Sequence, residues 1–397
     1  MNTHQNPYRW IVLILFLLVA GISQMLWLNF APILSFIEKQ YQVSESQAGL
    51  LLLVFPLIYV ILSVPAGALT DKKGYRYSIS LGAIIMAVFA CLRVYTSSFW
   101  ILLLAQIGIA IGQPYAVNGI SKLVMDWFSE EQAAIATGLG TMGMFIGMAA
   151  GMAVTPMMID AIGFQKTMIA FAGITLTISV LFLVFAKNNP QSKKEVLKEV
   201  SIKEGFLPLI KNRPLLKIFG VAFLGLGFFN GLTTWIEPIL APNGINSTQA
   251  GNIGGILIVG GIFGAVMIPG LSDYFKMRKP FLLGSIVIAL LTVYPLCTSR
   301  DYSLILTLSA IQGFFFLPAF ALLLEMCSEL AGQALAGSAT GILMLAGNAG
   351  GVIVILAMEA VKGESTSFFH SVLLMIALLI IAVALCLFLP ETFKRKH

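Results

Sequence analysis

The sequence predicts an all-α membrane protein with twelve transmembrane helices in two related six-helix halves. Three observations indicate this fold class. Of the 397 residues, 58% are hydrophobic and only 11% are charged, whereas soluble domains carry about 25% charged residues. The apolar residues gather into runs long enough to span a bilayer, and short motifs recur at an almost constant offset. Lipid must therefore be the main solvent of this chain.

The apolar runs number twelve when they are divided at charged or turn-forming segments. A helix needs about 20 apolar residues to cross the hydrocarbon core. The first run is too long for the core of a signal peptide, so we interpret it as a span. The expected spans are 10–36, 47–70, 77–95, 99–125, 133–158, 164–186, 215–238, 248–272, 280–298, 302–327, 333–360 and 367–390.

The positions of lysine and arginine predict the orientation, because cytosolic loops carry an excess of both residues. With the N-terminus in the cytosol, only Lys39, Arg93, Lys166, Arg300 and Lys362 of the 24 basic residues fall outside the inner segments. We therefore expect both termini to be cytosolic.

An internal repeat places the two halves in parallel register. Segments 46–49 (SQAG) and 248–251 (TQAG) are separated by 202 residues, as are 68–71 (ALTD) and 270–273 (GLSD). The tripeptide ATG recurs at 136–138 and 339–341, at an offset of 203. The predicted units are an N-terminal half, 1–186, a charged cytosolic linker with a short surface helix, 187–214, and a C-terminal half, 215–397. Repeats of this kind place a substrate site between the halves near the bilayer midplane.

Several other classes of function are disfavoured by the residues present. The four cysteines are scattered without a CxxC pair, so we expect buried structural thiols and no metal site. The sequence has no evident nucleophile–base pair, so an enzyme is not expected, and neither is a cofactor. Nucleic acid is an unsuitable partner, because the apolar segments leave no basic face outside the membrane.

The loop after the second expected span reads GALTDKKGYR, from Gly67 to Arg76. It resembles the G-x-L-x-D-x-x-G-x-R signature of the major facilitator superfamily, which implies a twelve-helix transporter with a gate at this loop. We expect Gly67 to allow close helix approach, Gly74 to allow a tight turn and Asp71 to accept hydrogen bonds. The basic residues, including Arg76, would anchor the loop to an anionic leaflet.

Further gate residues are expected at the inner ends of other spans. A degenerate copy of the loop motif contains Asp273, Lys276, Arg278 and Lys279. Lys122 and Glu325 are 203 residues apart and are expected to pair, with a role as interfacial residues as the alternative. Glycines at a spacing of four predict close helix packing in lipid, at Gly143, Gly147, Gly151, Gly347 and Gly351.

The central parts of the spans carry neutral polar and aromatic residues instead of ionisable ones. A buried amide is costly unless it has a partner, so we expect these residues to face a cavity, with helix–helix hydrogen bonding as the alternative. Aromatic rings with amides suit a quaternary cation and would equally suit a neutral solute. The predicted substrate-binding residues are Trp27, Asn29, Gln113, Tyr115, Asn118, Phe145, Asn230, Trp235, Gln312 and Asn348.

A narrower resemblance is carried by Trp27, by the stretch from Trp100 to Pro156, and by segment 313–315 (GFF) together with Glu325. Here the chain resembles the feline leukaemia virus subgroup C receptor-related transporters. This resemblance implies choline and ethanolamine as substrates, with haem proposed for some members. It also implies substrate contacts for Trp27 and Gln113.

The sequence departs from that family and from proton-coupled transporters at several positions. Asn230 stands where the family has a tyrosine, and Asn348 stands where it has a glutamine. No histidine lies where it could ligate haem in a cavity. Many proton-coupled members carry an arginine in helix 4 where this chain has Gln106, which disfavours proton antiport.

The sequence therefore predicts an alternating-access transporter of a small polar organic solute, with a choline-like amine as the favoured substrate and uniport or weak coupling as the mode. One alternative is a proton-coupled metabolite or drug exporter, and another is a non-transporting membrane receptor or sensor. We expect a multi-pass monomer of the plasma membrane whose partners are its solute and the lipid bilayer. Asn246 begins a sequence that fits a glycosylation acceptor.

Overall fold

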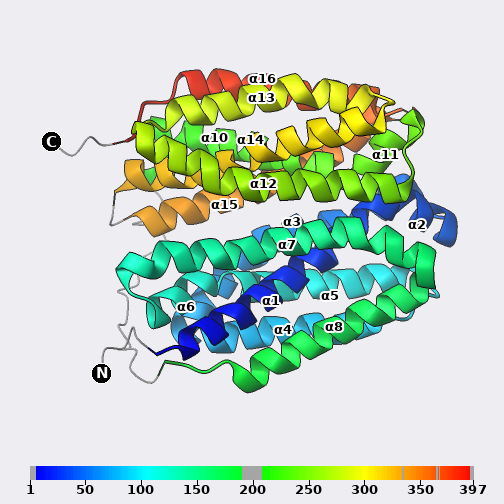
Figure 1. Ribbon diagram of the computed structural model, residues 1–397, viewed down its shortest axis with the longest axis horizontal. Helices are drawn as coiled ribbons and strands as arrows, with labels where there is room; N and C mark the ends of the chain where they lie inside the picture. Colours follow the sequence, from blue (N-terminus) through cyan, green and yellow to red (C-terminus); the bar gives the residue numbers. More distant parts are fainter. Residues whose placement is uncertain (1–5, 190–207, 333–334, 364, 366, 394–397) are drawn as a thin grey trace. The chain divides into compact units, whose positions relative to one another are not determined.

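The computed structural model describes residues 6–189, 208–332, 335–363, 365 and 367–393. The chain divides into two compact units, Met1–Val196 and Leu197–His397. The expected surface helix of the linker falls largely on residues 190–207, which lie outside the described part. All the regular elements of the described residues are helices (Figure 1).

The N-terminal unit contains α1 (Tyr8–Leu28), η2 (Ala31–Ile33), α2 (Leu34–Tyr41), α3 (Glu45–Lys73), α4 (Tyr75–Leu92), α5 (Phe99–Val117), α6 (Ile120–Trp127), α7 (Glu130–Ile162) and α8 (Phe164–Phe185). The C-terminal unit contains α10 (Arg213–Thr234), α11 (Ile236–Leu240), η3 (Ala241–Asn243), α12 (Ser247–Phe275), α13 (Lys279–Thr298), α14 (Tyr302–Ala331), α15 (Ala336–Lys362) and α16 (Phe369–Leu387).

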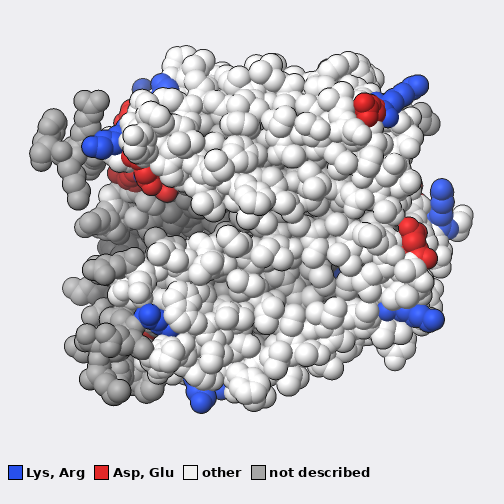
Figure 2. Space-filling view, viewed as in Figure 1, with Lys and Arg blue, Asp and Glu red and all other residues white. Residues whose placement is uncertain are grey.

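Twelve helical segments in the described residues are long and apolar enough to cross a membrane. This confirms the predicted number of spans, and most boundaries fall within a few residues of those expected. In Figure 2 the charged side chains of each unit gather at the ends of the helices and leave an uncharged band between them. An uncharged surface of this kind suits a lipid environment.

The repeat seen in the sequence corresponds to a pair of equivalent helix starts. At the start of α3, the Ser44 hydroxyl accepts from the Gln47 N–H, and the Gln47 side chain accepts from the Ser44 N–H. Asn246 and Gln249 form the same reciprocal capping box at the start of α12. Each box gives hydrogen-bond acceptors to two backbone N–H groups at the start of a helix. The related SQAG and TQAG sequences therefore begin the same element in both halves.

The first and seventh spans are broken, although the sequence indicated two continuous runs. Helix α1 ends at Leu28, four residues before Pro32, and α10 ends at Thr234, four residues before Pro238. A proline has no N–H to donate to the carbonyl four residues earlier, and its ring clashes with that carbonyl. Short helical pieces continue each span beyond the break.

Glycines bring the broken helices close to a neighbour in each unit. A β-carbon placed on Gly147 of α7 would lie 1.9 Å from the carbonyl oxygen of Gly21 in α1. In the C-terminal unit, a β-carbon on Gly350 of α15 would lie 2.0 Å from the carbonyl oxygen of Phe223 in α10. The predicted close packing of the glycine-rich helices is therefore present, and small residues are required because the backbones are in contact.

Candidate functional site

Trp27 and Asn29 lie where the first span is broken. The Trp27 ring is stacked on Phe55 of α3 with centroids 5.9 Å apart, and its indole N–H donates to the Leu52 carbonyl at 3.2 Å. Asn29 is fully buried, and neither atom of its side-chain amide has a partner in the described residues. A buried amide without hydrogen-bond partners destabilises the folded protein. A ligand that reaches the break would supply the missing donor and acceptor.

Gln113 occupies the same unit on α5 and is 4% exposed. Its helix contacts α1, α3 and α4, so a buried glutamine there lies among the spans of this half. The predicted group Trp27, Asn29 and Gln113 is therefore buried within one unit. Phe145 of α7 is half-buried in the same unit.

Two predicted binding residues of the N-terminal unit instead contact neighbouring helices. Asn118 ends α5 and accepts from the Tyr59 hydroxyl at 2.8 Å, while its amide N–H donates to the Ser63 carbonyl at 3.1 Å. Tyr115 is half-buried, and its carbonyl accepts from Ser78 of α4 at 2.9 Å. The polar contacts of Asn118 match the alternative interpretation, which is helix–helix hydrogen bonding.

Arg93 is a buried charge near one end of the third expected span, 77–95. It is 1% exposed, and its guanidinium donates to the side-chain oxygen of Gln106 at 2.9 Å and to the Leu26 carbonyl at 3.3 Å. This half therefore buries a charged side chain at the end of α4. The sequence gave no signal that the side chain turns inward.

In the C-terminal unit, Asn230 and Asn348 have different surroundings. Asn230 of α10 is 2% exposed, its amide oxygen has no partner among the described residues, and it lies against Gly351 of α15. Asn348 of α15 is half-buried and donates to the Met344 carbonyl of its own helix at 2.9 Å. Asn230 therefore has a free hydrogen-bond acceptor inside this unit.

Trp235 and Gln312 are held by contacts within the C-terminal unit. The Trp235 ring is fully buried, lies 5.4 Å from Phe368, and donates its indole N–H to the Ile355 carbonyl at 3.3 Å. Gln312 of α14 is 1% exposed and accepts a short hydrogen bond from Thr292 of α13. Both residues link helices, as the alternative interpretation of these polar residues expected, but the Gln312 amide nitrogen has no partner among the described residues.

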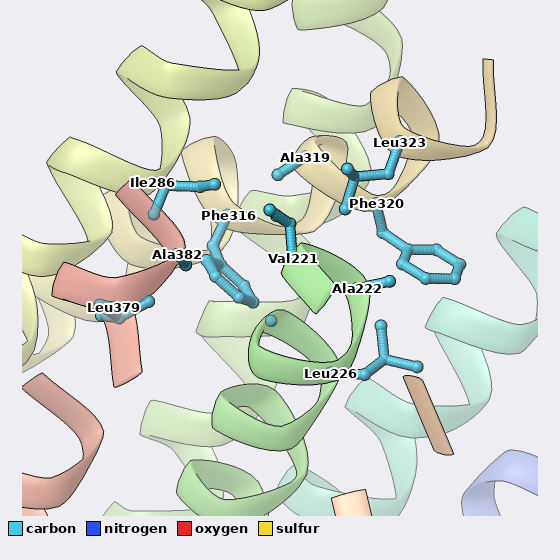
Figure 3. A pocket seen from close by; sticks show the side chains of 11 residues that line it. Val221, Ala222, Leu226, Ile286, Phe316, Ala319, Phe320, Leu323, Leu379 and Ala382 are labelled. Carbon is cyan, nitrogen blue, oxygen red and sulfur yellow. The ribbon is translucent and has the colours of Figure 1, made fainter. Parts of the chain in front are cut away.

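The C-terminal unit also encloses an apolar cavity that the sequence did not indicate (Figure 3). Its volume of about 20 Å³ is enough for roughly one water molecule. Its wall has no charged or amide side chain, so a polar solute would find no partner there. The lining residues are Val221, Ala222, Gly225, Leu226, Ile286, Phe316, Ala319, Phe320, Leu323, Leu379 and Ala382.

The loop between α3 and α4 turns at Gly74, as predicted. Gly74 has φ +86°, a left-handed conformation that side chains rarely adopt. Arg76 is half-buried and lies 3.5 Å from the Leu183 carbonyl of α8, while Asp71 is exposed. A β-carbon on Gly67 would meet no atom within 4 Å. The expected close helix approach at Gly67 stays a prediction.

The equivalent loop of the C-terminal unit carries an ionic cluster around Arg278. Its guanidinium lies 2.6 Å from the Asp273 carboxylate, 2.8 Å from Glu325 and 3.3 Å from Glu329. Burial lowers the pKa of Arg278, but these three carboxylates more than offset burial and hold the pKa above its usual value. The Glu391 carboxylate accepts from the Arg278 N–H at 2.8 Å, which ties the end of the chain to this loop.

Glu325 is therefore paired with Arg278 inside its own half. Its expected partner Lys122 belongs to the other unit and is half-buried on α6. The Lys122–Glu325 pair stays a prediction. The repeated motif in the sequence pointed to Asp273 and Arg278. Glu329 of α14 and Glu391, which follows α16, gave no signal because they lie far along the chain from this loop.

We predict that Arg278→Met destabilises the C-terminal unit by about 2 kcal/mol. This value lies between the small contribution of exposed pairs and the roughly 3–5 kcal/mol lost when a buried pair is broken, because the carboxylates are partly exposed. Thermal unfolding of the purified protein measures the change. Lys276→Met removes an exposed charge from the same loop and is the control. Adding Glu325→Gln to the Arg278→Met variant should restore part of the stability, because it removes a carboxylate that has lost its partner. A further loss of stability would contradict the pairing of Arg278 with Glu325.

The twelve candidate spans of the described residues, together with the family match, define a membrane transporter. The chain belongs to the Major Facilitator Superfamily, whose family profile matches residues 16–355. Crystal structures of a bacterial homolog of the human lysosomal transporter Spinster share this fold. The inward-facing, unoccupied form has a TM-score of 0.76 at 18% identity and covers 96% of this chain and 97% of that one. The inward-facing, occupied form has a TM-score of 0.79 at 16% identity, with the same coverage.

Curated relatives include named transporters. The choline/ethanolamine transporter FLVCR1 of Mus musculus is 24% identical over 407 residues, covering 93% of this chain and 72% of the mouse protein. The choline/ethanolamine transporter flvcr2a of Danio rerio is 22% identical over 423 residues, covering 100% of this chain and 89% of the zebrafish protein. An uncharacterized protein of Archaeoglobus fulgidus is 31% identical over 212 residues, covering 53% of this chain and 95% of that protein.

Proposed function

We propose that this transporter carries a small polar organic solute, that the solute is a choline-like amine, and that transport is uniport or weakly coupled. The observation that carries the proposal is the break in the first span. There the chain carries a buried tryptophan ring and, two residues further on, a buried asparagine whose side-chain amide has no partner in the described residues. An aromatic face attracts an ammonium group through cation–π interaction, and the amide would bind the hydroxyl of the same molecule.

Supporting arguments come from the same unit and from the relatives. Gln113 is buried on α5 and supplies a second amide. The relatives named as choline/ethanolamine transporters cover most of the chain. In the C-terminal half we propose Asn230 and Asn348 as further polar contacts, and the loops at Asp71 and Arg278 as parts of the gate. We also propose the plasma membrane as the location and a monomer as the working form.

The test is uptake by proteoliposomes that contain the purified wild-type protein. We expect saturable uptake of labelled choline or ethanolamine, competition by other small amines, and no requirement for a pH gradient. Empty liposomes and a sugar substrate are the controls. Absence of amine binding and amine uptake by folded protein would reject the substrate class. Binding without any flux would instead favour the receptor alternative.

Glu237 favours a second candidate, which is proton-coupled export. This carboxylate is 3% exposed in α11, directly after the break in the seventh span. Ionisable residues at membrane depth often take part in proton relays. Under this alternative, uptake would follow an imposed pH gradient, and Glu237→Gln would remove that dependence. Uptake that is equal with and without the gradient would reject it.

A further inference from the structure

The last turn of α1 is held by side chains from two other helices. Because α1 ends at Leu28, the Leu26 carbonyl belongs to the turn whose oxygens lack a helical donor. The Gln106 amide of α5 donates to this oxygen at 3.0 Å, and the Arg93 guanidinium after α4 donates to it at 3.3 Å. Arg93 also donates to the Gln106 side-chain oxygen at 2.9 Å. The three groups form a closed triangle of hydrogen bonds.

The charge of Arg93 is balanced by neutral groups and not by a carboxylate. Its partners in the described residues are the Leu26 carbonyl, the Gln106 amide, the Met168 sulfur at 3.4 Å and the Phe30 ring, whose centroid is 4.7 Å away. A buried charge needs compensation, and the C-terminal end of a helix carries partial negative charge. The broken end of α1 therefore stabilises Arg93, and Arg93 in turn stabilises the break.

The described residues of the C-terminal unit contain no equivalent of this triangle. Ser309 occupies the position 203 residues after Gln106, and its hydroxyl donates to the Ile253 carbonyl of α12. There the residue next to the break, Trp235, binds the neighbouring helix directly through its indole N–H. The arginine–glutamine arrangement therefore belongs to the half that contains Trp27.

We propose that Arg93 and Gln106 are positioning residues of the substrate site, because they fix the helix end that carries Trp27. This inference rests on the proposed function. Leu26 directly precedes Trp27, so the carbonyl that the two side chains hold is part of the peptide group that sets the Trp27 backbone. While this peptide group is held, the indole stacks on Phe55 and donates to the Leu52 carbonyl. Release of the peptide group would free the indole from both contacts. Neither Arg93 nor Gln106 needs to contact the solute.

The test follows Trp27 directly in protein labelled with 5-fluorotryptophan. Its ¹⁹F resonance is assigned by its loss in Trp27→Phe. We expect Arg93→Met and Gln106→Leu each to shift or broaden this resonance, to leave the other tryptophan signals in place, and to raise the Kd for choline at least tenfold. The double variant should have the same Kd as either single variant, because both side chains donate to the same Leu26 carbonyl oxygen. Arg93→Lys should recover part of the affinity.

Arg300→Met is the matched control, because Arg300 follows α13 at an outer helix end but is exposed. It should change neither the resonance nor the Kd. If Arg93→Met does not fold, Gln106→Glu, which keeps an acceptor for Arg93 but removes the amide donor, decides the question. A Trp27 signal that stays unchanged in a folded variant overturns the inference, and so does a moved signal with unchanged affinity. If the wild-type protein binds no amine, the proposed function fails while the resonance still tests the helix end.

Discussion

Trp27→Ala is expected to weaken choline binding about thirtyfold and to reduce uptake in proportion. A desolvated cation–π contact contributes about 2 kcal/mol, and each 1.4 kcal/mol corresponds to about a tenfold change in affinity. The ring is 9% exposed, and its position is fixed by stacking on Phe55 and by the hydrogen bond to the Leu52 carbonyl. Equilibrium binding of labelled choline to the purified protein gives the Kd directly.

Trp100→Ala is the matched control for this prediction. Trp100 is a tryptophan of α5 that is 61% exposed, so its loss removes a ring of the same size from a surface position. Its Kd should stay at the wild-type value. Trp27→Phe keeps an aromatic face but loses the N–H that donates to Leu52, and it should give an intermediate affinity. Equal affinities for Trp27→Ala and Trp100→Ala would remove Trp27 from the site.

Gly147→Ala is expected to destabilise the N-terminal unit by about 3 kcal/mol. The added β-carbon would lie 1.9 Å from the Gly21 carbonyl oxygen and 2.7 Å from its Cα. Backbone atoms cannot rotate away as a side chain can, so α1 and α7 must separate. Forcing extra carbon into a packed interface costs about 1–3 kcal/mol or more. Thermal unfolding in detergent should show a clear fall in the unfolding temperature.

A graded series of glycine variants makes this prediction specific. The β-carbon would lie 2.6 Å from the Met25 carbonyl oxygen in Gly151→Ala and 3.0 Å from the Gly143 carbonyl oxygen in Gly21→Ala, so the losses should decrease in that order. Gly138→Ala in the same helix as Gly147 would meet nothing within 4 Å. It should be neutral or stabilising, because alanine favours a helix by about 1 kcal/mol over glycine. If Gly147→Ala is as stable as Gly138→Ala, the close contact of α1 with α7 is wrong.

The predicted binding residues separate into two groups once their neighbours are known. Asn29 and Asn230 have unpaired buried amide atoms, whereas Asn118 is satisfied on both sides of its amide. All three are asparagines in apolar runs, and the sequence alone cannot distinguish them. The partners of Asn118 lie on α3, more than 50 residues earlier in the chain, and no local pattern reports such distances.

The sequence by itself determined the class of protein, the number of spans and the repeat, because hydrophobicity, loop turns and helix caps are local properties. The turn at Gly74 is an example, since it lies at the residue that allows it. The SQAG and TQAG repeat is another, because the helix caps found there act within a few residues. Only the tertiary structure decided which polar groups meet. Arg93 lies near the end of an apolar run, where a charge often reaches the membrane surface, yet its acceptor on Leu26 is 67 residues earlier. The free energy of the buried Arg93 charge depends on the distant end of α1. Only the folded structure shows that these two groups are in contact.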